Sequence, residues 1–184
     1  MDTGAAFTGG SGNDTFNAIA TTFSAGDVLN GGAGTDTVTL YGTPGTMPTM
    51  KNIEKLVVAA AANAALDVST TSGGFTSFYI TDASALSGKT VTTGSGVALG
   101  LGTASGVATA GTVTWAASPT DTSATLNLTG YQGGTLVTAA NLTVTGSATT
   151  TLNVSSTGAK NAIATFTLPA TQATLNVSGD KAFV

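Results

Sequence analysis

Short stretches of alternating apolar and polar residues recur along most of this chain, and three are near-copies: ATLNLTG at 124–130, TTLNVSS at 150–156 and ATLNVSG at 173–179. Each contains two large apolar residues separated by one position and flanked by Thr, Ser, Asn or Gly. Because side chains alternate between the two faces of a β-strand, this pattern predicts strands with one buried face. The same pairs recur at Leu66/Val68, Phe78/Ile80, Val97/Leu99, Val113/Trp115, Leu126/Leu128, Leu142/Val144, Leu152/Val154, Phe166/Leu168 and Leu175/Val177.

Two all-β architectures accommodate strand cores that recur every roughly 9 to 19 residues: a β-solenoid and a sandwich of short strands. In a solenoid, similar strands stack like on like, so the near-copies favour an irregular parallel β-solenoid, with a β-sandwich as the alternative. One stretch, VVAAAANAALDV at 57–68, is also compatible with a helix by propensity. The residues on either side of this stretch favour a strand followed by a loop to the same degree as a helix.

The first quarter of the chain has a different sequence pattern, which contains two copies of one nonapeptide. GGSGNDTFN (Gly9–Asn17) and GGAGTDTVT (Gly31–Thr39) both fit the pattern G-G-x-G-x-D-x-U-x, where U is a large apolar residue. Glycine permits a tight turn with inward carbonyl oxygens, Asp supplies a carboxylate, and U starts a short buried strand. Because Ca²⁺ takes six to eight oxygen ligands and accepts carbonyls beside carboxylates, stacked turns of this kind predict calcium sites. A pair of plain Gly/Asp hairpin turns is the alternative.

A degenerate third copy, AGDVLN, lies between the two nonapeptides. Asp27 and Leu29 precede Asp36 and Val38 by nine residues each, which makes Asp27 a further candidate ligand, with a strand cap as the alternative. Gly9 and Gly31 are 22 residues apart instead of 18, so about four residues around AIATTF form an inserted loop.

The composition changes near TPGTMPTM (Thr43–Met50), where two of the four prolines lie. Residues 1–45 are rich in Gly and Asp, whereas residues 46–184 are rich in Thr, Ser, Val and Leu. We therefore expect a domain boundary at this point, with a turn before the strand NIEKLVV.

Composition excludes several functions. The chain has no Cys and no His, which removes disulfides, thiol nucleophiles, Cys/His zinc sites and imidazole bases, so we expect no enzymatic activity. Its five basic residues are scattered lysines that form no stripe for phosphates, and no apolar run approaches the roughly 20 residues of a membrane span. Nucleic-acid binding and membrane insertion are therefore not expected.

The remaining residues of possible function have simpler interpretations. Asp67, Asp82, Asp121 and Asp180 are isolated acids in Ser/Thr-rich turns, where we expect solvated turn residues. Asn-x-Ser/Thr tripeptides begin at Asn127, Asn141, Asn153 and Asn176, each flanked by apolar residues, which indicates outward strand positions. Trp115 and Tyr131 could form a carbohydrate platform, but the alternation around Trp115 favours the core.

The nonapeptides and their surroundings resemble a known family. GNDTFNAIATTFSAGDVLNGGAGTDTVTL, followed after a gap by NIEKLVV, is similar to the RTX-containing S-layer proteins of Gram-negative bacteria. The resemblance implies a short RTX calcium β-roll at 1–45, followed by the Thr/Ser-rich β region at 46–184. It also implies type I secretion, a location at the cell surface, and a structural, non-catalytic role in a self-assembling array. A repeat segment of an RTX adhesin and a non-catalytic accessory domain of a secreted enzyme remain the alternatives.

The resemblance also implies the ligands of Ca²⁺. Asp14, Asp27 and Asp36 would supply side chains, Asn13 would belong to the same site, and the carbonyls would come from Gly9, Gly10, Gly12, Gly31, Gly32 and Gly34. AAFTGG lacks the preceding Asp and SAGDVLN lacks the double Gly, so the outer sites depart from the pattern. The expected partners are further copies of the chain and, through regions outside these 184 residues, a cell-surface polysaccharide.

Overall fold

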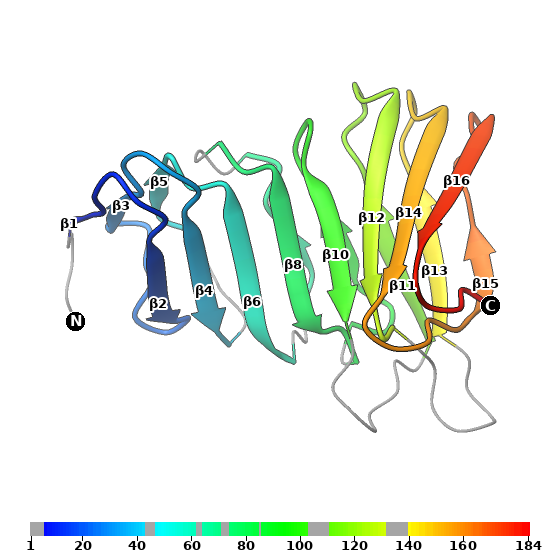
Figure 1. Cartoon of the computed structure of the whole chain (residues 1–184), viewed down its shortest axis with the longest axis horizontal. Helices are drawn as coiled ribbons and strands as arrows, with labels where there is room; N and C mark the ends of the chain where they lie inside the picture. The colour runs from blue at the N-terminus through cyan, green and yellow to red at the C-terminus, as the bar shows by residue number, and fades with distance from the viewer. Residues whose placement is uncertain are drawn as a thin grey trace.

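The computed structural model describes residues 6–42, 47–61, 64–70, 74–84, 86–102, 111–131 and 140–184. These residues form an all-β, parallel β-solenoid of about six turns without a helix. Figure 1 shows the turns following one another along the long axis, with the N-terminus at one end and the C-terminus at the other. Within the described ranges, no helix is long and apolar enough to cross a membrane.

One side of the solenoid is a continuous eight-stranded sheet, and every named pair in it is parallel. Its strands follow one another in chain order from one end of the molecule to the other. They are β2 (Thr15–Ile19), β4 (Thr37–Tyr41), β6 (Lys55–Ala61), β8 (Ser77–Asp82), β10 (Ala98–Gly102), β12 (Ser123–Thr129), β14 (Thr151–Thr157) and β16 (Thr174–Gly179).

The other side is divided into two parallel sheets. The first contains β1 (Ala6–Thr8), β3 (Val28–Asn30) and β5 (Thr49–Lys51). The second contains β7 (Leu66–Asp67), β9 (Thr90–Thr92), β11 (Gly111–Ala116), β13 (Ala140–Thr145) and β15 (Ile163–Thr167). The change of sheet falls between β5 and β7, close to the predicted boundary at 45/46, while the pairing of β4 with β6 continues across it.

This architecture confirms the favoured solenoid and excludes the sandwich, whose strands would pair antiparallel. The Ala-rich stretch is extended rather than helical, since β6 runs to Ala61 and β7 begins at Leu66; Ala62 and Asn63 lie outside the described residues. Stacking of like on like holds for β14 and β16, where Asn153 pairs with Asn176. It does not hold for β12 and β14, where Thr125 pairs with Asn153, a displacement of two residues that keeps the same side chains inward.

The core lies between the two sides of the solenoid. Most of the predicted apolar pairs are buried there, because each turn covers the inward side chains of its neighbour. In β10 the buried pair is Leu99 and Leu101 instead of Val97 and Leu99, since the strand begins only at Ala98. Leu175 and Val177 of β16 are exposed, because β16 is the last strand of its sheet and no described strand covers it.

The two aromatic residues considered for a carbohydrate platform belong to this core. Trp115 and Tyr131 are fully buried, and the Trp115 Nε1–H donates to the hydroxyl of Thr93, also buried, at 3.0 Å. A buried indole N–H with a partner is the expected arrangement for a core tryptophan. The interpretation of Trp115 as a core residue is therefore confirmed.

Candidate metal site in the stacked turns

The two nonapeptide turns lie directly against each other at one edge of the solenoid. Residues 9–14 connect β1 to β2 and residues 31–36 connect β3 to β4, while the shorter turn 52–54 connects β5 to β6. The Ala33 N–H donates to the Gly10 carbonyl at 3.0 Å, and the Thr35 N–H donates to Asn13 Oδ1 at 2.8 Å. We call residues 9–14, 31–36 and 52–54 the turn stack.

Three carboxylates form a column in the turn stack. Asp14, Asp36 and Glu54 immediately precede Thr15, Thr37 and Lys55, which are paired in register across β2, β4 and β6. The Asp14 N–H donates to Asp36 Oδ1 at 2.7 Å, and the Asp36 N–H donates to Glu54 Oε2 at 2.7 Å. Asp36 and Glu54 thus each accept the backbone N–H of the acid in the preceding turn, whereas Asp14 accepts the Gly10 N–H of its own turn, so like charges lie on neighbouring turns.

Asp36 is the central member of this column and is fully buried. Its Oδ1 accepts the Asp14 N–H, whereas its Oδ2 has no hydrogen-bond partner among the described residues. Burying an anionic oxygen without a partner is costly, so Asp36 Oδ2 is the atom of the turn stack that could accept a bound water or cation.

Oxygen atoms crowd around the glycines of the turn stack. A Cβ built on Gly31 would overlap both the Asn52 carbonyl oxygen and Asp36 Oδ2, and a Cβ on Gly9 would meet the Gly31 carbonyl oxygen and Asp14 Oδ2. The arrangement is the same in two successive turns: a carbonyl oxygen of the next turn and the carboxylate of the same turn face one glycine. Only glycine leaves room for this concentration of oxygen atoms.

These donors fit calcium. They are carbonyl, carboxylate and amide oxygens, the hard ligands that Ca²⁺ prefers, and they come from backbone held rigidly by strand pairing. The described residues contain no group of three or more His, Cys, Asp or Glu that converge on one point. A site in the turn stack would therefore rely on backbone carbonyls as well as on Asp14 and Asp36.

Asp27 lies apart from the other predicted ligands. It ends the loop between β2 and β3, at the opposite edge of the solenoid from the turn stack. Its Oδ2 accepts hydrogen bonds from the backbone N–H of Ser24 at 2.7 Å and from the Ser24 hydroxyl at 3.2 Å, so its carboxylate caps a local turn. The structure brings Asp14 and Asp36 together and leaves Asp27 elsewhere.

Sequence reasoning missed two members of the turn stack. Glu54 follows Asp36 by 18 residues, the length of two nonapeptides, and Lys55-Leu56 continues the x-U pattern. Asn52 adopts a positive φ of 51°, which asparagine tolerates better than most residues, close to where the earlier turns have glycine. The 18-residue spacing was the signal that could have identified this third, glycine-free turn.

Asp67 and Asp121, which lie outside the turn stack, also accept hydrogen bonds. Asp67 Oδ1 accepts from the N–H and the hydroxyl of Ser69. Asp121 accepts from the Ser95 hydroxyl at 2.5 Å and from the Gly96 N–H at 2.7 Å, which joins loops of two neighbouring turns. Asp67 is exposed, as expected for a solvated acid, although it ends β7 (Leu66–Asp67), whereas Asp121 is half-buried and links loops of two neighbouring turns.

The second glycine of each nonapeptide provides a matched test of this packing. Gly32 has a φ of 97°, and a Cβ on it would overlap the Gly10 carbonyl oxygen, whereas a Cβ on Gly10 would meet only Asp14 Oδ2 at 3.9 Å. Gly32→Ala is therefore expected to lower the free energy of unfolding by about 2 kcal/mol or more, and Gly10→Ala by less than about 1 kcal/mol. Urea denaturation of both variants measures the difference, and equal losses would contradict the close stacking.

Comparisons with known proteins give no relative: no family model, no curated protein and no solved structure matches the chain.

Proposed function

We propose that this chain is a structural building block of a secreted, calcium-stabilised bacterial surface layer that self-assembles into an ordered array, as its resemblance to RTX-containing S-layer proteins implies. The observation that carries the proposal is the fully buried, unpartnered Oδ2 of Asp36 among the carbonyl oxygens of the turn stack. The role is structural and non-catalytic, and residues 1–45 act as the RTX-like roll.

Within this proposal, Asp14 and Asp36 hold the ion together with carbonyl oxygens of the surrounding turns. When bound, Ca²⁺ supplies a divalent positive charge that accepts six to eight oxygen ligands. The column of carboxylates on neighbouring turns then no longer opposes the stacking of β2 on β4 and of β4 on β6. The glycines keep the turns close enough for oxygens of successive turns to reach one point.

The chain's folding would follow from the same residues. Without their ion, the buried carboxylate of Asp36 and its charged neighbours oppose formation of the first turns, which favours an extended chain suited to type I secretion. Sites with a Kd of about 10⁻⁴–10⁻³ M fill only at extracellular calcium concentrations. The Thr/Ser-rich remainder of the solenoid would then provide length and contact surface for the array at the cell surface.

Electron microscopy of the purified protein with millimolar calcium and with chelator tests this function. A surface-layer block gives ordered two-dimensional arrays in calcium and none in chelator. A segment of an RTX adhesin would remain monomeric and bind cells or sugars, and an accessory domain would remain monomeric without such binding. Either of these results would contradict the proposal.

A further inference from the structure

The chain contains a single Asn-Gly pair, Asn30-Gly31, and the pair lies at the turn stack. Asn30 is the last residue of β3 (Val28–Asn30), and Gly31 is the first residue of the turn that follows. Glycine has no Cβ, so its backbone nitrogen can approach the side-chain carbonyl carbon of a preceding asparagine with little hindrance. Every other asparagine of the chain precedes a residue with a side chain. Asn30 is therefore the asparagine of this chain that is chemically most prone to deamidation.

Deamidation at this pair is an intramolecular substitution at Cγ of Asn30. The Gly31 nitrogen gives up its proton and forms a bond to Cγ, the bond from Cγ to Nδ2 breaks, and ammonia leaves with that proton, so a cyclic imide remains. Water then opens the ring at either carbonyl. One opening gives aspartate, and the other gives isoaspartate, in which the main chain passes through Cβ and Cγ. Water is the only co-reactant, and no oxidant or metal takes part.

Both reacting groups are engaged elsewhere in the folded chain. The Gly31 N–H donates to the Lys51 carbonyl at 3.0 Å, and Gly31 is buried. Asn30 Oδ1 accepts the Gly32 N–H at 3.2 Å and the Asn52 Nδ2–H at 2.9 Å, which fixes the side chain. The nitrogen is therefore committed to strand pairing while the carbonyl group is held by two donors, and ring closure requires these bonds to break.

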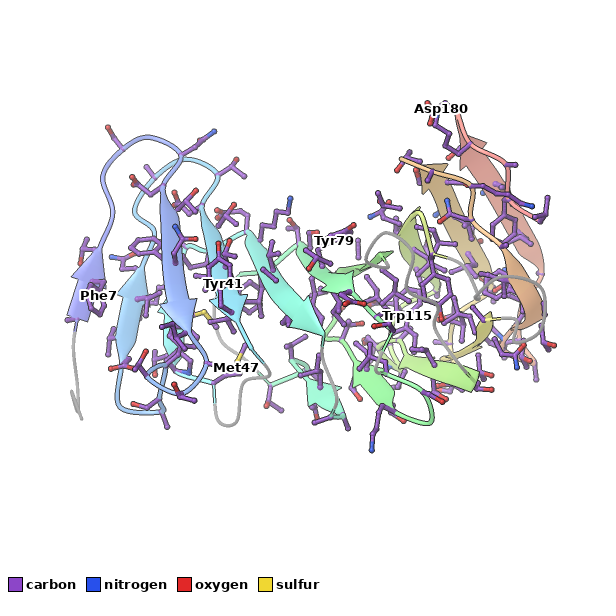
Figure 2. All side chains as sticks on the ribbon, turned by 90° about the horizontal axis from the view of Figure 1, so that it is seen from below. Phe7, Tyr41, Met47, Tyr79, Trp115 and Asp180 are labelled. Atoms are coloured by element: carbon purple, nitrogen blue, oxygen red, sulfur yellow. The ribbon has the colours of Figure 1, made fainter. Side chains whose placement is uncertain are left out.

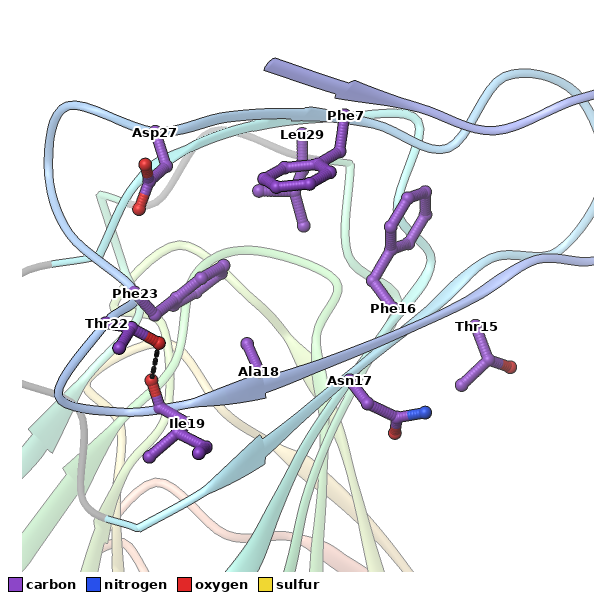
Figure 3. Close-up of a pocket in the computed structure, with 10 residues that line it drawn as sticks. All are labelled: Phe7, Thr15, Phe16, Asn17, Ala18, Ile19, Thr22, Phe23, Asp27 and Leu29. Carbon is purple, nitrogen blue, oxygen red and sulfur yellow. Dashed lines mark hydrogen bonds between the residues drawn. The ribbon is translucent and has the colours of Figure 1, made fainter. Parts of the chain in front are cut away.

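The strand that carries Asn30 is held on both sides. β3 pairs in parallel with β1 and with β5. Leu29 is buried, and Figure 3 shows its side chain directed into the interior together with Phe16 and Phe23. A Cβ built on Gly31 would overlap the Asn52 carbonyl oxygen, so the turn has no free space in which the chain could rotate. Local opening of the turn stack must therefore precede the reaction.

We propose that Asn30 is a site of spontaneous deamidation that the folded turn stack protects, and that its isoaspartate product prevents this turn from re-forming. The chain is modified there only while the turn is open, so Asn30 records the time that the chain spends unfolded. The inference makes no use of calcium or of array formation, and it stands or fails separately from the proposed function.

The two products differ in what they do to the turn stack. Aspartate at position 30 keeps a side-chain oxygen that can accept both N–H groups now bound by Asn30 Oδ1, from Gly32 and Asn52. Isoaspartate inserts an additional carbon into the main chain. The Asn30 carbonyl oxygen accepts the Gly9 N–H at 2.8 Å, and the additional carbon moves this bond and the following turn out of register. Aspartate is therefore compatible with the fold, and isoaspartate is not.

Peptide mapping by mass spectrometry tests the protection. The intact chain is incubated at mildly alkaline pH in one calcium-containing buffer, with and without enough urea to abolish its β-type circular dichroism. Asn30 should deamidate at least about tenfold faster in urea than in the folded chain, and in urea it should react before Asn127 and Asn153. Equal rates at Asn30 with and without urea, a faster reaction in the folded chain, or no preference for Asn30 in urea would overturn the inference.

Two variants test whether the turn stack provides the protection. Gly32→Ala strains this turn against the Gly10 carbonyl and should raise the rate without urea by about 5- to 30-fold. Tyr41→Ala changes a half-exposed residue of β4, which Figure 2 shows in the same half of the molecule as Phe7, and should leave the rate within about twofold of the parent. In urea the three chains should react alike. Equal rates for Gly32→Ala and Tyr41→Ala without urea would overturn the inference.

Refolding of the modified chain tests the products. After incubation in urea, the urea is removed and the folded fraction is separated by size-exclusion chromatography. Isoaspartate at position 30 should be depleted at least about tenfold from the folded fraction, whereas Asn30→Asp should fold with the same urea midpoint as the parent. Equal isoaspartate contents in the folded and misfolded fractions, or failure of Asn30→Asp to fold, would overturn the assignment of the products.

Discussion

Replacing Asp36 with alanine is expected to abolish most of the stabilisation by calcium while leaving a β-type circular dichroism spectrum. The substitution removes a carboxylate oxygen of the proposed site and the acceptor of the Asp14 N–H. In chelator, the unpaired Asp14 N–H should cost about 1–3 kcal/mol. In calcium, the variant should also lose the roughly 2.7 kcal/mol that a hundredfold excess of ligand over Kd provides. Ordered arrays should give way to monomers or amorphous aggregates, because the first turns no longer fold over their neighbours.

Two control variants accompany Asp36→Ala. The first separates the charge of Asp36 from its hydrogen bond, and the second tests whether loss of a carboxylate elsewhere has the same effect. Asp36→Asn keeps an acceptor for Asp14 but removes the buried charge, so it should melt no lower than the parent in chelator and still lack the calcium response. Asp67→Ala removes one carboxylate that caps Ser69, far from the turn stack, and should keep the full calcium response. Melting curves of the three variants in calcium and in chelator provide the comparison. A full calcium response in Asp36→Ala would show that Asp36 is not a ligand.

The second large effect concerns the core. Trp115→Ala should lower the free energy of unfolding by about 3–5 kcal/mol, because it removes a fully buried indole between Val91 and Val144 and leaves a cavity. It also removes the donor to the buried hydroxyl of Thr93. Chemical denaturation measures the loss.

Trp115→Phe should cost less, since it keeps an aromatic ring and loses only the Nε1–H and some volume. Tyr41→Ala, at a half-exposed position on β4, should change stability by less than about 0.5 kcal/mol. The calcium-induced rise in melting temperature should persist in Trp115→Ala, because Trp115 lies on β11, away from the turn stack. A loss below about 1 kcal/mol for Trp115→Ala would contradict its place in a packed core.

The alternation of apolar and polar residues predicted most strands of the Thr/Ser-rich region and their buried faces, because one face of each strand must meet the core. It missed β9 and placed the buried pair of β10 two residues too early. It could not reveal which strands lie at an end. Leu175 and Val177 lie in the same local sequence as Leu152 and Val154, yet only Leu152 and Val154 are buried. A strand is buried only where the next turn of the solenoid covers it. The pairing register could not be predicted from the sequence pattern either. β12 and β14 are near-copies but pair with a displacement of two residues, and such a displacement keeps the same side chains facing inward.

For the turn stack, the nonapeptides identified Asp14, Asp36 and the glycines that approach neighbouring carbonyls. The degenerate third copy also suggested Asp27, which lies at the opposite edge. Successive loops along a solenoid alternate between its two edges, and Asp27 is in the loop between β2 and β3, whereas the turn stack includes the loops before β2 and before β4. Glu54 has no glycines before it and only its 18-residue spacing marks its place. A nine-residue pattern describes the residues of a single connecting turn. It cannot predict the contacts between turns, and the hydrogen bonds of the turn stack join residues 18 to 22 positions apart.

The central claim is that the turn stack binds calcium and stabilises the fold, and a thermal melt of the intact chain tests it most directly. Curves are recorded in chelator, in about 1 mM calcium and in the same concentration of magnesium, which demands stricter octahedral geometry and smaller ion–oxygen distances. The account predicts a melting temperature that rises with calcium concentration, as mass action requires, and a much smaller rise with magnesium. Identical curves in calcium and in chelator would contradict it.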